Sequence, residues 1–370
     1  MTAPLVVFAH KGHDWIRGSE QCVLDLLSGL DRTRYRLLVV ANGRALLRES
    51  ERLGVRAVRV AHWGGGRILN APWRHVMRGI LRAHQPALIH ANMAVALPLI
   101  IPASRKLAIP VVTHLHLSYD SLGPRHQALV RASDVIVGVA EHVVATLRAD
   151  PETAARVRVI RNAVNVERLG HCGSADVRSE LGIPRGAFVA TSVGSLIDRK
   201  AHAVTIRAIG IARQRGLDVH LLLCGDGERE SELRTLTETL GLGGSIHFMG
   251  VRRDVGAILE RGSDVLVTSA CEEALPLSML EAQWLGVPVI ASDIAAHKEM
   301  SRGVEWGLLA PCGDADTLAE ALAVLARDPS RRAALGVAAR LHARECYSMD
   351  RYVAEFDALY RELLVDGSAR

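Results

Sequence analysis

Two glutamates, Glu273 and Glu281, frame the start of a predicted helix in the second half of the chain. Residues 269–292 have the pattern of loop, helix, turn and strand, with Pro276 suited to the first helical turn. The first amides of a helix lack intrahelical partners and carry partial positive charge, so they favour anions. A carboxylate instead accepts hydrogen bonds from the paired hydroxyls of a sugar. The stretch suits a ligand with a diphosphate and a sugar, although a capping glutamate and a solvated one give the same pattern.

Two loops upstream of this helix add cations and glycines. The first begins at Gly194, after a predicted strand, and ends in the adjacent pair Arg199 and Lys200, which could neutralise a diphosphate leaving group. Solvated loop charges are the alternative. The second loop carries Gly225 and Gly227, half of a dinucleotide fingerprint whose third glycine is missing. A Rossmann dehydrogenase is therefore disfavoured.

In the first half, the loop after the first predicted strand contains His13 and Asp14, candidates for binding an acceptor or acting as a base. Gly18 permits close approach of the backbone to a ligand, and Ser19 is a candidate N-cap for the next helix. Loop residues of this kind are also often merely solvated. The sequence alone is compatible with both interpretations, a ligand-binding loop and a solvated one.

Histidines follow a later strand of the same half. His114 and His116 are two residues apart on this strand, so both side chains are expected on the same side. They either face a ligand crevice or are hydrogen-bonded within the structure. Two histidines are too few for a metal site, and Asp314 with Asp316 precedes a helix in a way that favours N-capping over metal binding. No metal and no cofactor are expected.

Short β-branched runs alternate with amphipathic stretches along most of the chain, which predicts βαβ units on parallel sheets covered on both faces. Ligands of such sheets gather at the carboxyl ends of the strands. The length of 370 residues suggests two similar α/β domains with the ligand between them. The expected divisions are a first domain over 1–166, a linker over 167–184, a second domain over 185–348, and a closing helix over 349–370 packed on the first domain.

Composition narrows the class of protein. The chain is 49% hydrophobic and 23% charged, as in globular proteins, and its 4% aromatic content disfavours a single-stranded nucleic-acid platform. A net charge of +5 favours anionic partners. The six cysteines show no zinc spacing, so reduced, buried thiols are expected. With neither a signal peptide nor a membrane span in the pattern, we expect a cytoplasmic protein with at most peripheral contact with the inner membrane face. The basic stretch 72–84 could lie on an anionic membrane, but a solvated cationic helix face is the preferred interpretation.

Taken together, these motifs resemble glycosyltransferase family 4, retaining enzymes with the GT-B fold of two Rossmann-like domains facing a central cleft. The resemblance covers nearly the whole chain and depends on the order and spacing of motifs that are each weak alone. They are the segments 17–20, 113–116, 162–165, 194–200, 225–227, 247–250, 273–281 and 286–291.

The resemblance implies a role for each matching residue. Glu281 would bind the ribose, Glu273 the donor-sugar hydroxyls, and Arg199 with Lys200 the diphosphate. Gly18 would lie near the phosphates and His116 near the donor sugar, while amides around Leu277 and Ser278, with the glycines 194, 225 and 227, would complete the nucleotide site. Three departures concern the phosphate contacts: Arg17 and Pro276 stand where the family often has glycine, and Ser195 where it often has arginine.

The implied reaction is transfer of a sugar, with retention at the anomeric carbon, from a nucleotide diphosphate to an acceptor hydroxyl. UDP is the first choice of nucleotide, and the acceptor is a small natural product, a lipid carrier or a polysaccharide. A nucleotide-sugar epimerase, a phosphorylase and a non-catalytic nucleotide-sugar-binding protein are the competing hypotheses. An inverting transferase with His13 or Asp14 as base is another.

Overall fold

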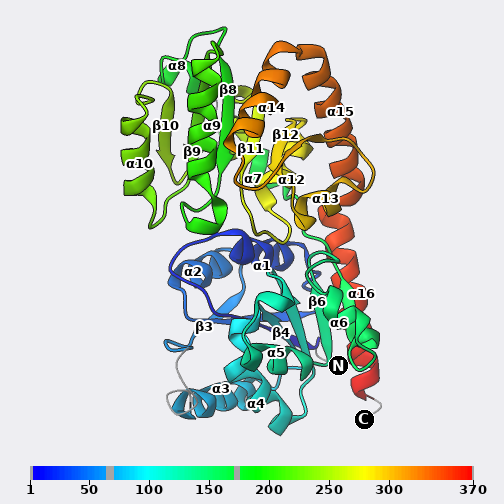
Figure 1. The fold of residues 1–370 in the computed structure, drawn as a ribbon. Coiled ribbons are helices and arrows are strands. Elements are labelled where there is room, and N and C mark those ends of the chain that lie inside the picture. Colours follow the sequence, from blue (N-terminus) through cyan, green and yellow to red (C-terminus); the bar gives the residue numbers. More distant parts are fainter. Residues whose placement is uncertain (1–2, 64–70, 171–175, 369–370) are drawn as a thin grey trace. The chain divides into compact units, whose positions relative to one another are not determined.

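A computed structural model describes residues 3–63, 71–170 and 176–368 of the chain (Figure 1). It divides the chain into two compact units. The first unit combines Met1–Ala163 with Met349–Arg370, and the second unit is Val164–Ser348. Within the described residues, no helix is both long and apolar enough to cross a bilayer.

The described part of the first unit contains one parallel sheet of seven strands. Its strands, in spatial order, are β3 (Arg56–Arg59), β2 (Arg36–Ala41), β1 (Leu5–His10), β4 (Leu88–Asn92), β5 (Val111–Leu115), β6 (Val135–Gly138) and β7 (Val157–Val159). The order reverses between β1 and β4, which pair in parallel with His10 opposite Asn92. Such a reversal opens a crevice at the carboxyl ends of these strands.

Helices connect these strands and cover the sheet. They are α1 (Gly18–Gly29), α2 (Arg44–Arg52), α3 (Ala71–His84), α4 (Leu97–Leu107), α5 (Pro124–Arg131), α6 (Ala145–Ala149) and α16 (Met349–Ser368), with short turns η1 (Ala94–Ala96), η2 (Tyr119–Ser121) and η3 (Ala154–Arg156). Although α16 ends the chain, its residues Tyr352, Phe356 and Tyr360 are buried in the same core cluster as Phe8 of β1. The last helix is therefore an integral part of the first unit.

The described part of the second unit contains a parallel sheet of six strands. In spatial order these are β10 (Ile246–Gly250), β9 (Val219–Cys224), β8 (Phe188–Val193), β11 (Val265–Thr268), β12 (Val289–Ser292) and β13 (Gly307–Ala310). Both faces of this sheet are covered, because neighbouring residues of one strand belong to different core clusters: Ala190 lies in one and Val189 in the other. The prediction of two α/β domains with parallel sheets is confirmed.

Helices connect the strands of the second unit and also lie in the predicted linker. They are α7 (Val166–Gly170), α8 (Val177–Glu180), α9 (His202–Gln214), α10 (Glu230–Thr239), α11 (Val255–Ala257), α12 (Leu277–Leu285), α13 (Ala295–Ser301), α14 (Ala315–Arg327) and α15 (Pro329–Cys346), with the turns η4 (Asp198–Lys200) and η5 (Ile258–Gly262). Helices α7 and α8 lie in the predicted linker, and α13 was not predicted. Helices α14 and α15 are separated at Asp328, which caps α15 by accepting from Arg331 N at 2.8 Å, just before Pro329.

A disulfide joins Cys271 and Cys312, so the prediction that the cysteines are reduced is wrong for this pair. Their separation of 41 residues gave no signal in the sequence. The fold brings them together because Cys271 follows β11 and Cys312 follows β13, the two neighbours of β12. Their Cα atoms lie 5.6 Å apart, which suits a disulfide. Cys22 and Cys224 are buried thiols that take no part in this disulfide, whereas Cys172 lies outside the described residues.

Candidate active site

Two cations and a carboxylate meet at the carboxyl ends of β8 and β11, which pair in the second sheet. Lys200 Nζ donates to Glu273 Oε1, and Arg199 Nη1 lies 3.3 Å from Glu273 Oε2. The Glu273 side chain is 7% exposed and that of Lys200 is 15% exposed. Burial acts to raise the pKa of Glu273, but the charges of Lys200 and Arg199 outweigh it and lower the pKa. The group is therefore an ionised carboxylate shared by two cations.

Backbone contacts hold the two loops of this cluster together. Cys271 N donates to the Arg199 carbonyl at 3.1 Å, and Arg199 Nη1 donates to the Glu272 carbonyl at the same distance. Below the cations, His202 Nε2 lies 3.1 Å from the Ser195 carbonyl, and burial lowers the pKa of this histidine to about 4. A neutral imidazole thus anchors the loop that carries Arg199.

The predicted glycines bring two backbone segments into direct contact. A Cβ atom on Gly225 would lie 1.9 Å from the Gly194 carbonyl oxygen, and one on Gly227 would lie 2.4 Å from that of Leu196. Hydrogen bonds cross the same contact, from Gly194 N to the Cys224 carbonyl and from Leu196 N to that of Asp226. These glycines are needed for the close packing of the two loops, and this packing fixes the position of the backbone that leads to Arg199.

Helix α12 starts beside this cluster. Pro276 was predicted to lie in the first helical turn but is the N-cap, directly before it. Leu277 and Ser278 begin the first turn, where amides lack intrahelical partners. Farther along the helix, Glu281 is buried and accepts from Arg168 Nη2 of α7 at 2.5 Å. Within the second unit, the predicted anion-binding amides and both predicted glutamates therefore belong to one loop and helix.

The first unit contains a chain of polar side chains at the reversal of its strand order. Glu20 Oε1 lies 2.9 Å from His10 Nε2, His10 Nδ1 lies 3.0 Å from Asn92 Nδ2, and Asn92 Oδ1 lies 2.8 Å from His116 Nε2. Burial acts to raise the pKa of Glu20, but the hydrogen bond and charge of His10 outweigh it and lower the pKa. Burial, and then His10, lowers the pKa of His116 to about 3. This imidazole is neutral at ordinary pH.

His114 differs from its neighbour His116 although their rings are 4.2 Å apart. It is 1% exposed, and its Nε2 has no hydrogen-bond partner among the described residues. Burial lowers its pKa well below the usual value. His114 is packed into the core beside Phe356, whereas His116 ends the polar chain.

His13, Asp14 and Gly18 take no part in this chain of hydrogen-bonded side chains. His13 is exposed and stacks on Trp15 at 4.3 Å, while Asp14 accepts from the amide of Arg44 at the start of α2. Gly18 has open space around its Cβ position and needs no special backbone angle. Ser19 was expected to be the N-cap, which is wrong: Arg17 takes that position and Ser19 Oγ donates to Glu20.

Two glycosyltransferase family models match the two halves of the chain. The model of "Glycosyltransferase Family 4" matches residues 16–168, and the model of "Glycosyl transferases group 1" matches residues 174–342. The chain belongs to this glycosyltransferase family.

Curated relatives of the chain have names from several biosynthetic settings. The lipopolysaccharide core biosynthesis glycosyltransferase LpsE of Rhizobium meliloti is 32% identical over 216 residues, covering 57% of this chain and 59% of the relative. A D-inositol 3-phosphate glycosyltransferase of Salinispora tropica is 29% identical over 274 residues, covering 67% of this chain and 56% of the relative. The chain thus matches less than two thirds of the length of these relatives.

Solved structures share the fold of the chain. Anabaena HepE, crystallised with UDP-glucose, superposes with a TM-score of 0.85 over 97% of this chain and all of its own, at 21% identity. WaaG, described as a glycosyltransferase involved in lipopolysaccharide biosynthesis, gives 0.72 over 92% of this chain and 95% of its own, at 17% identity. At these identities the likeness establishes the GT-B architecture of two Rossmann-like domains.

Sequence reasoning missed four residues of the two clusters: His10, Glu20, Asn92 and Arg168. Glu20 was part of the family motif but had no role assigned, and Asn92 ends a strand, the position where ligand-facing residues are expected. Gly12 was also missed, although a Cβ there would lie 2.4 Å from Glu20 Oε1 and 2.6 Å from His10 Nε2.

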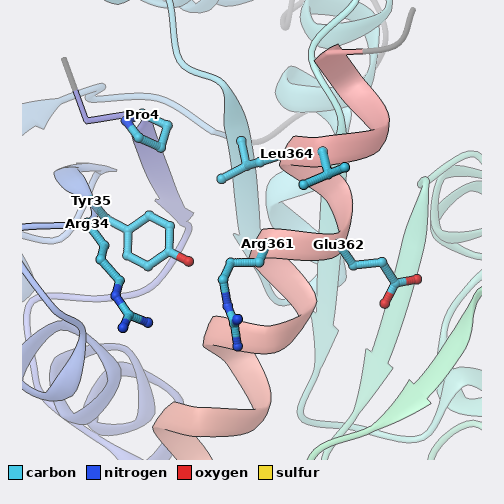
Figure 2. A pocket seen from close by; sticks show the side chains of 7 residues that line it. Pro4, Arg34, Tyr35, Arg361, Glu362 and Leu364 are labelled. Atoms are coloured by element: carbon cyan, nitrogen blue, oxygen red, sulfur yellow. The ribbon is translucent and has the colours of Figure 1, made fainter. Parts of the chain in front are cut away.

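A cavity of about 700 Å³ lies elsewhere in the first unit, lined by Pro4, Arg34, Tyr35, Arg361, Glu362, Leu364 and Val365. In Figure 2, Tyr35 and Arg361 lie on opposite sides of this cavity, and Arg361 belongs to α16. Pro4 and Tyr35 directly precede β1 and β2, so the cavity is at the amino ends of the strands. Because ligands of such sheets bind at the carboxyl ends, we do not assign the sugar-nucleotide site to this cavity.

Proposed function

We propose that this protein transfers a hexosyl or N-acetylhexosaminyl group, with retention, from a UDP-sugar to an acceptor hydroxyl. The observation that carries the proposal is the cluster of Arg199, Lys200 and Glu273 beside the first turn of α12. Two cations and unpaired amides suit a diphosphate, and a buried ionised carboxylate suits sugar hydroxyls. The crystallisation of Anabaena HepE with UDP-glucose supports the choice of nucleotide.

In this proposal the second unit binds the donor. Arg199 and Lys200 neutralise the diphosphate, together with the amides of Leu277 and Ser278. The carboxylate of Glu281 accepts from the ribose hydroxyls while Arg168 holds it in place. Glu273, released from part of its contact with the cations, accepts from hydroxyls of the sugar. The glycines at 194, 225 and 227 shape the loops around the phosphates.

The first unit contributes the groups nearer the reaction. We assign His116 to the donor sugar, Gly18 to the phosphates, and the loop with His13 and Asp14 to the acceptor. The acceptor hydroxyl attacks the anomeric carbon from the face that the diphosphate leaves, and a diphosphate oxygen takes its proton. The protein stabilises the departing charge and positions both substrates, with no side-chain nucleophile.

Neutralisation by these cations and amides needs neither a metal ion nor a cofactor, so turnover should persist in excess EDTA. The acceptor belongs to a small polyol, a lipid-linked sugar or a growing polysaccharide. The names of the relatives span these classes, among them a galactosyltransferase of Escherichia coli acting on GlcNAc-diphosphoundecaprenol, 31% identical over 172 residues. For such acceptors we place the enzyme in the cytoplasm, with at most peripheral membrane contact.

The test is a thermal-shift panel of UDP-, GDP-, ADP- and dTDP-sugars, followed by turnover with the donor that stabilises most. A UDP-sugar present at about 100 times its Kd should add about 2.7 kcal/mol to the free energy of unfolding. Glu281→Gln and Lys200→Ala should then each nearly abolish transfer with the far-ultraviolet circular dichroism unchanged. Near-normal turnover in either variant would contradict the assignment, and an epimerised donor without a glycosylated acceptor would indicate the competing reaction.

A further inference from the structure

The side-chain amide of Asn92 has a defined orientation. Its Nδ2 lies 3.1 Å from the carbonyl oxygen of Ser19, which can only accept a hydrogen bond. The nitrogen of the amide must therefore be on that side. It follows that the oxygen of the amide, Oδ1, faces His116 Nε2 at 2.8 Å.

This orientation determines where the protons lie on both histidines. Since Asn92 Oδ1 accepts, His116 Nε2 carries the hydrogen, and the other nitrogen, Nδ1, keeps its lone pair. Since Asn92 Nδ2 donates to His10 Nδ1 at 3.0 Å, His10 carries its hydrogen on Nε2 and donates it to Glu20 Oε1 at 2.9 Å. Each donor in the chain meets one acceptor.

Glu20, at the far end of this series of hydrogen bonds, is also held in place. Glu20 Oε2 accepts from Ser19 Oγ at 3.1 Å and from Arg17 N at 3.3 Å. Glu20, His10 and Asn92 are each at most 4% exposed, so water does not compete for these hydrogen bonds. Gly12 leaves room for the pair, because a Cβ there would collide with both side chains.

We propose that Glu20, His10 and Asn92 are positioning residues that hold His116 as the Nε2–H tautomer, so that its Nδ1 accepts a hydrogen bond from a hydroxyl of the donor sugar. The proposal deepens the proposed function and depends on it for the identity of the hydroxyl. In the neutral ring, the tautomer follows from these hydrogen bonds.

The charges around His116 support a neutral ring. The titratable groups that face it are His10 and Glu20 through the chain, and His90 and His114 on its other side. Burial lowers the pKa of His116 to about 3 and that of His90 also to about 3. Protonation of His116 would remove the hydrogen-bond acceptor at Nδ1. The buried surroundings disfavour protonation and therefore preserve this acceptor.

The first test replaces Asn92 by Asp, which keeps the acceptor for His116, removes the donor to Ser19 O and His10 Nδ1, and adds a negative charge beside His116. That charge raises the pKa of His116 toward neutrality and favours the imidazolium, which has no lone pair to offer. Relative to the wild type, kcat/KM should fall about 10- to 100-fold near pH 6 and recover toward about pH 8.5, as expected for loss of one hydrogen bond. A deficit that stays the same at every pH would overturn the proposal.

The second test uses Glu20, in case Asn92→Asp does not fold. Glu20→Gln retains an oxygen that accepts from His10 Nε2, whereas Glu20→Ala leaves that donor unpaired. We expect the Gln variant to stay within about threefold of the wild type and the Ala variant to lose about 10-fold in kcat. Equal losses in both would contradict the proposal. Tyr35→Phe is the matched control, because it deletes another part-buried hydrogen bond of the first unit, to Asp357 at 2.8 Å, far along the sheet from His116.

A third readout does not depend on activity. In protein labelled with ¹⁵N-histidine, the His116 signal, identified by its loss in His116→Gln, should show Nε2–H and no titration from about pH 5 to about pH 8 in the wild type. In Asn92→Asp the same signal should titrate in that range. An Nδ1–H tautomer in the wild type would overturn the proposal even if transfer occurs, and absent transfer with this spectrum would overturn the proposed function only.

Discussion

Replacing Glu273 by Gln should destabilise the second unit and increase its response to UDP. The substitution removes the charge that Lys200 and Arg199 share, and the Lys200 side chain is only 15% exposed. Breaking one partner of a buried ion pair costs about 3 to 5 kcal/mol, and the partial exposure of Lys200 favours the lower end, about 3 kcal/mol. For a unit of this size, that loss lowers the melting temperature by about 6 to 12 °C.

The assay is differential scanning fluorimetry of the wild type and Glu273→Gln, with and without UDP. The diphosphate offers the two cations a new partner, so UDP should raise the melting temperature more in the variant than in the wild type. The control is Glu273→Gln combined with Lys200→Met, which removes the uncompensated charge and should recover most of the stability. A variant that melts within about 1 °C of the wild type, or a UDP response no larger than the wild type's, would refute the reasoning.

Three further predictions concern the same unit. Reducing the exposed Cys271–Cys312 disulfide, which closes a separation of 41 residues, should lower the free energy of unfolding by about 4 kcal/mol, measured by urea denaturation with and without dithiothreitol; no change would contradict it. Gly225→Ala should cost more than about 2 kcal/mol because its Cβ would meet a carbonyl oxygen at 1.9 Å, whereas Gly243→Ala, with open space, should be nearly neutral by the same assay. Folding lowers the pKa of Glu273 from 4.5, so the stabilisation by its carboxylate is present above that pH and is lost as the pH falls below it. The melting temperatures of the wild type and Glu273→Gln should therefore converge on acidification. A constant difference between them would contradict the assignment.

Patterns along the chain predict the sheets well. Strands such as Phe188–Val193 and Val219–Cys224 are largely apolar runs of six residues, as expected for buried strands of a parallel sheet. The cap at Asp314 was also predictable from local chemistry, since its carboxylate accepts from Thr317 N at 3.0 Å. Local signals fail where a helix is short: α13 (Ala295–Ser301) has too few residues to show a period.

The candidate site was only partly predictable, for a physical reason. Loops at the carboxyl ends of strands pointed to Arg199, Lys200 and Glu273, and these residues do meet. By contrast, the partners of His116 and Glu281 come from distant parts of the sequence, and the pairing of Arg168 with Glu281 spans 113 residues. Side-chain partners of this kind depend on tertiary packing, which no local pattern encodes. The disulfide was missed for the same reason.

The central claim is a sugar transfer that retains configuration, and the configuration of the product tests it most directly. The wild type is incubated with the stabilising UDP-α-sugar and an accepted acceptor, and the anomeric proton of the first-formed product is observed by NMR. We predict a product with the α configuration and release of UDP. A β-configured product would contradict retention and favour a base-catalysed inversion, and an epimerised UDP-sugar without a glycoside would contradict transfer itself.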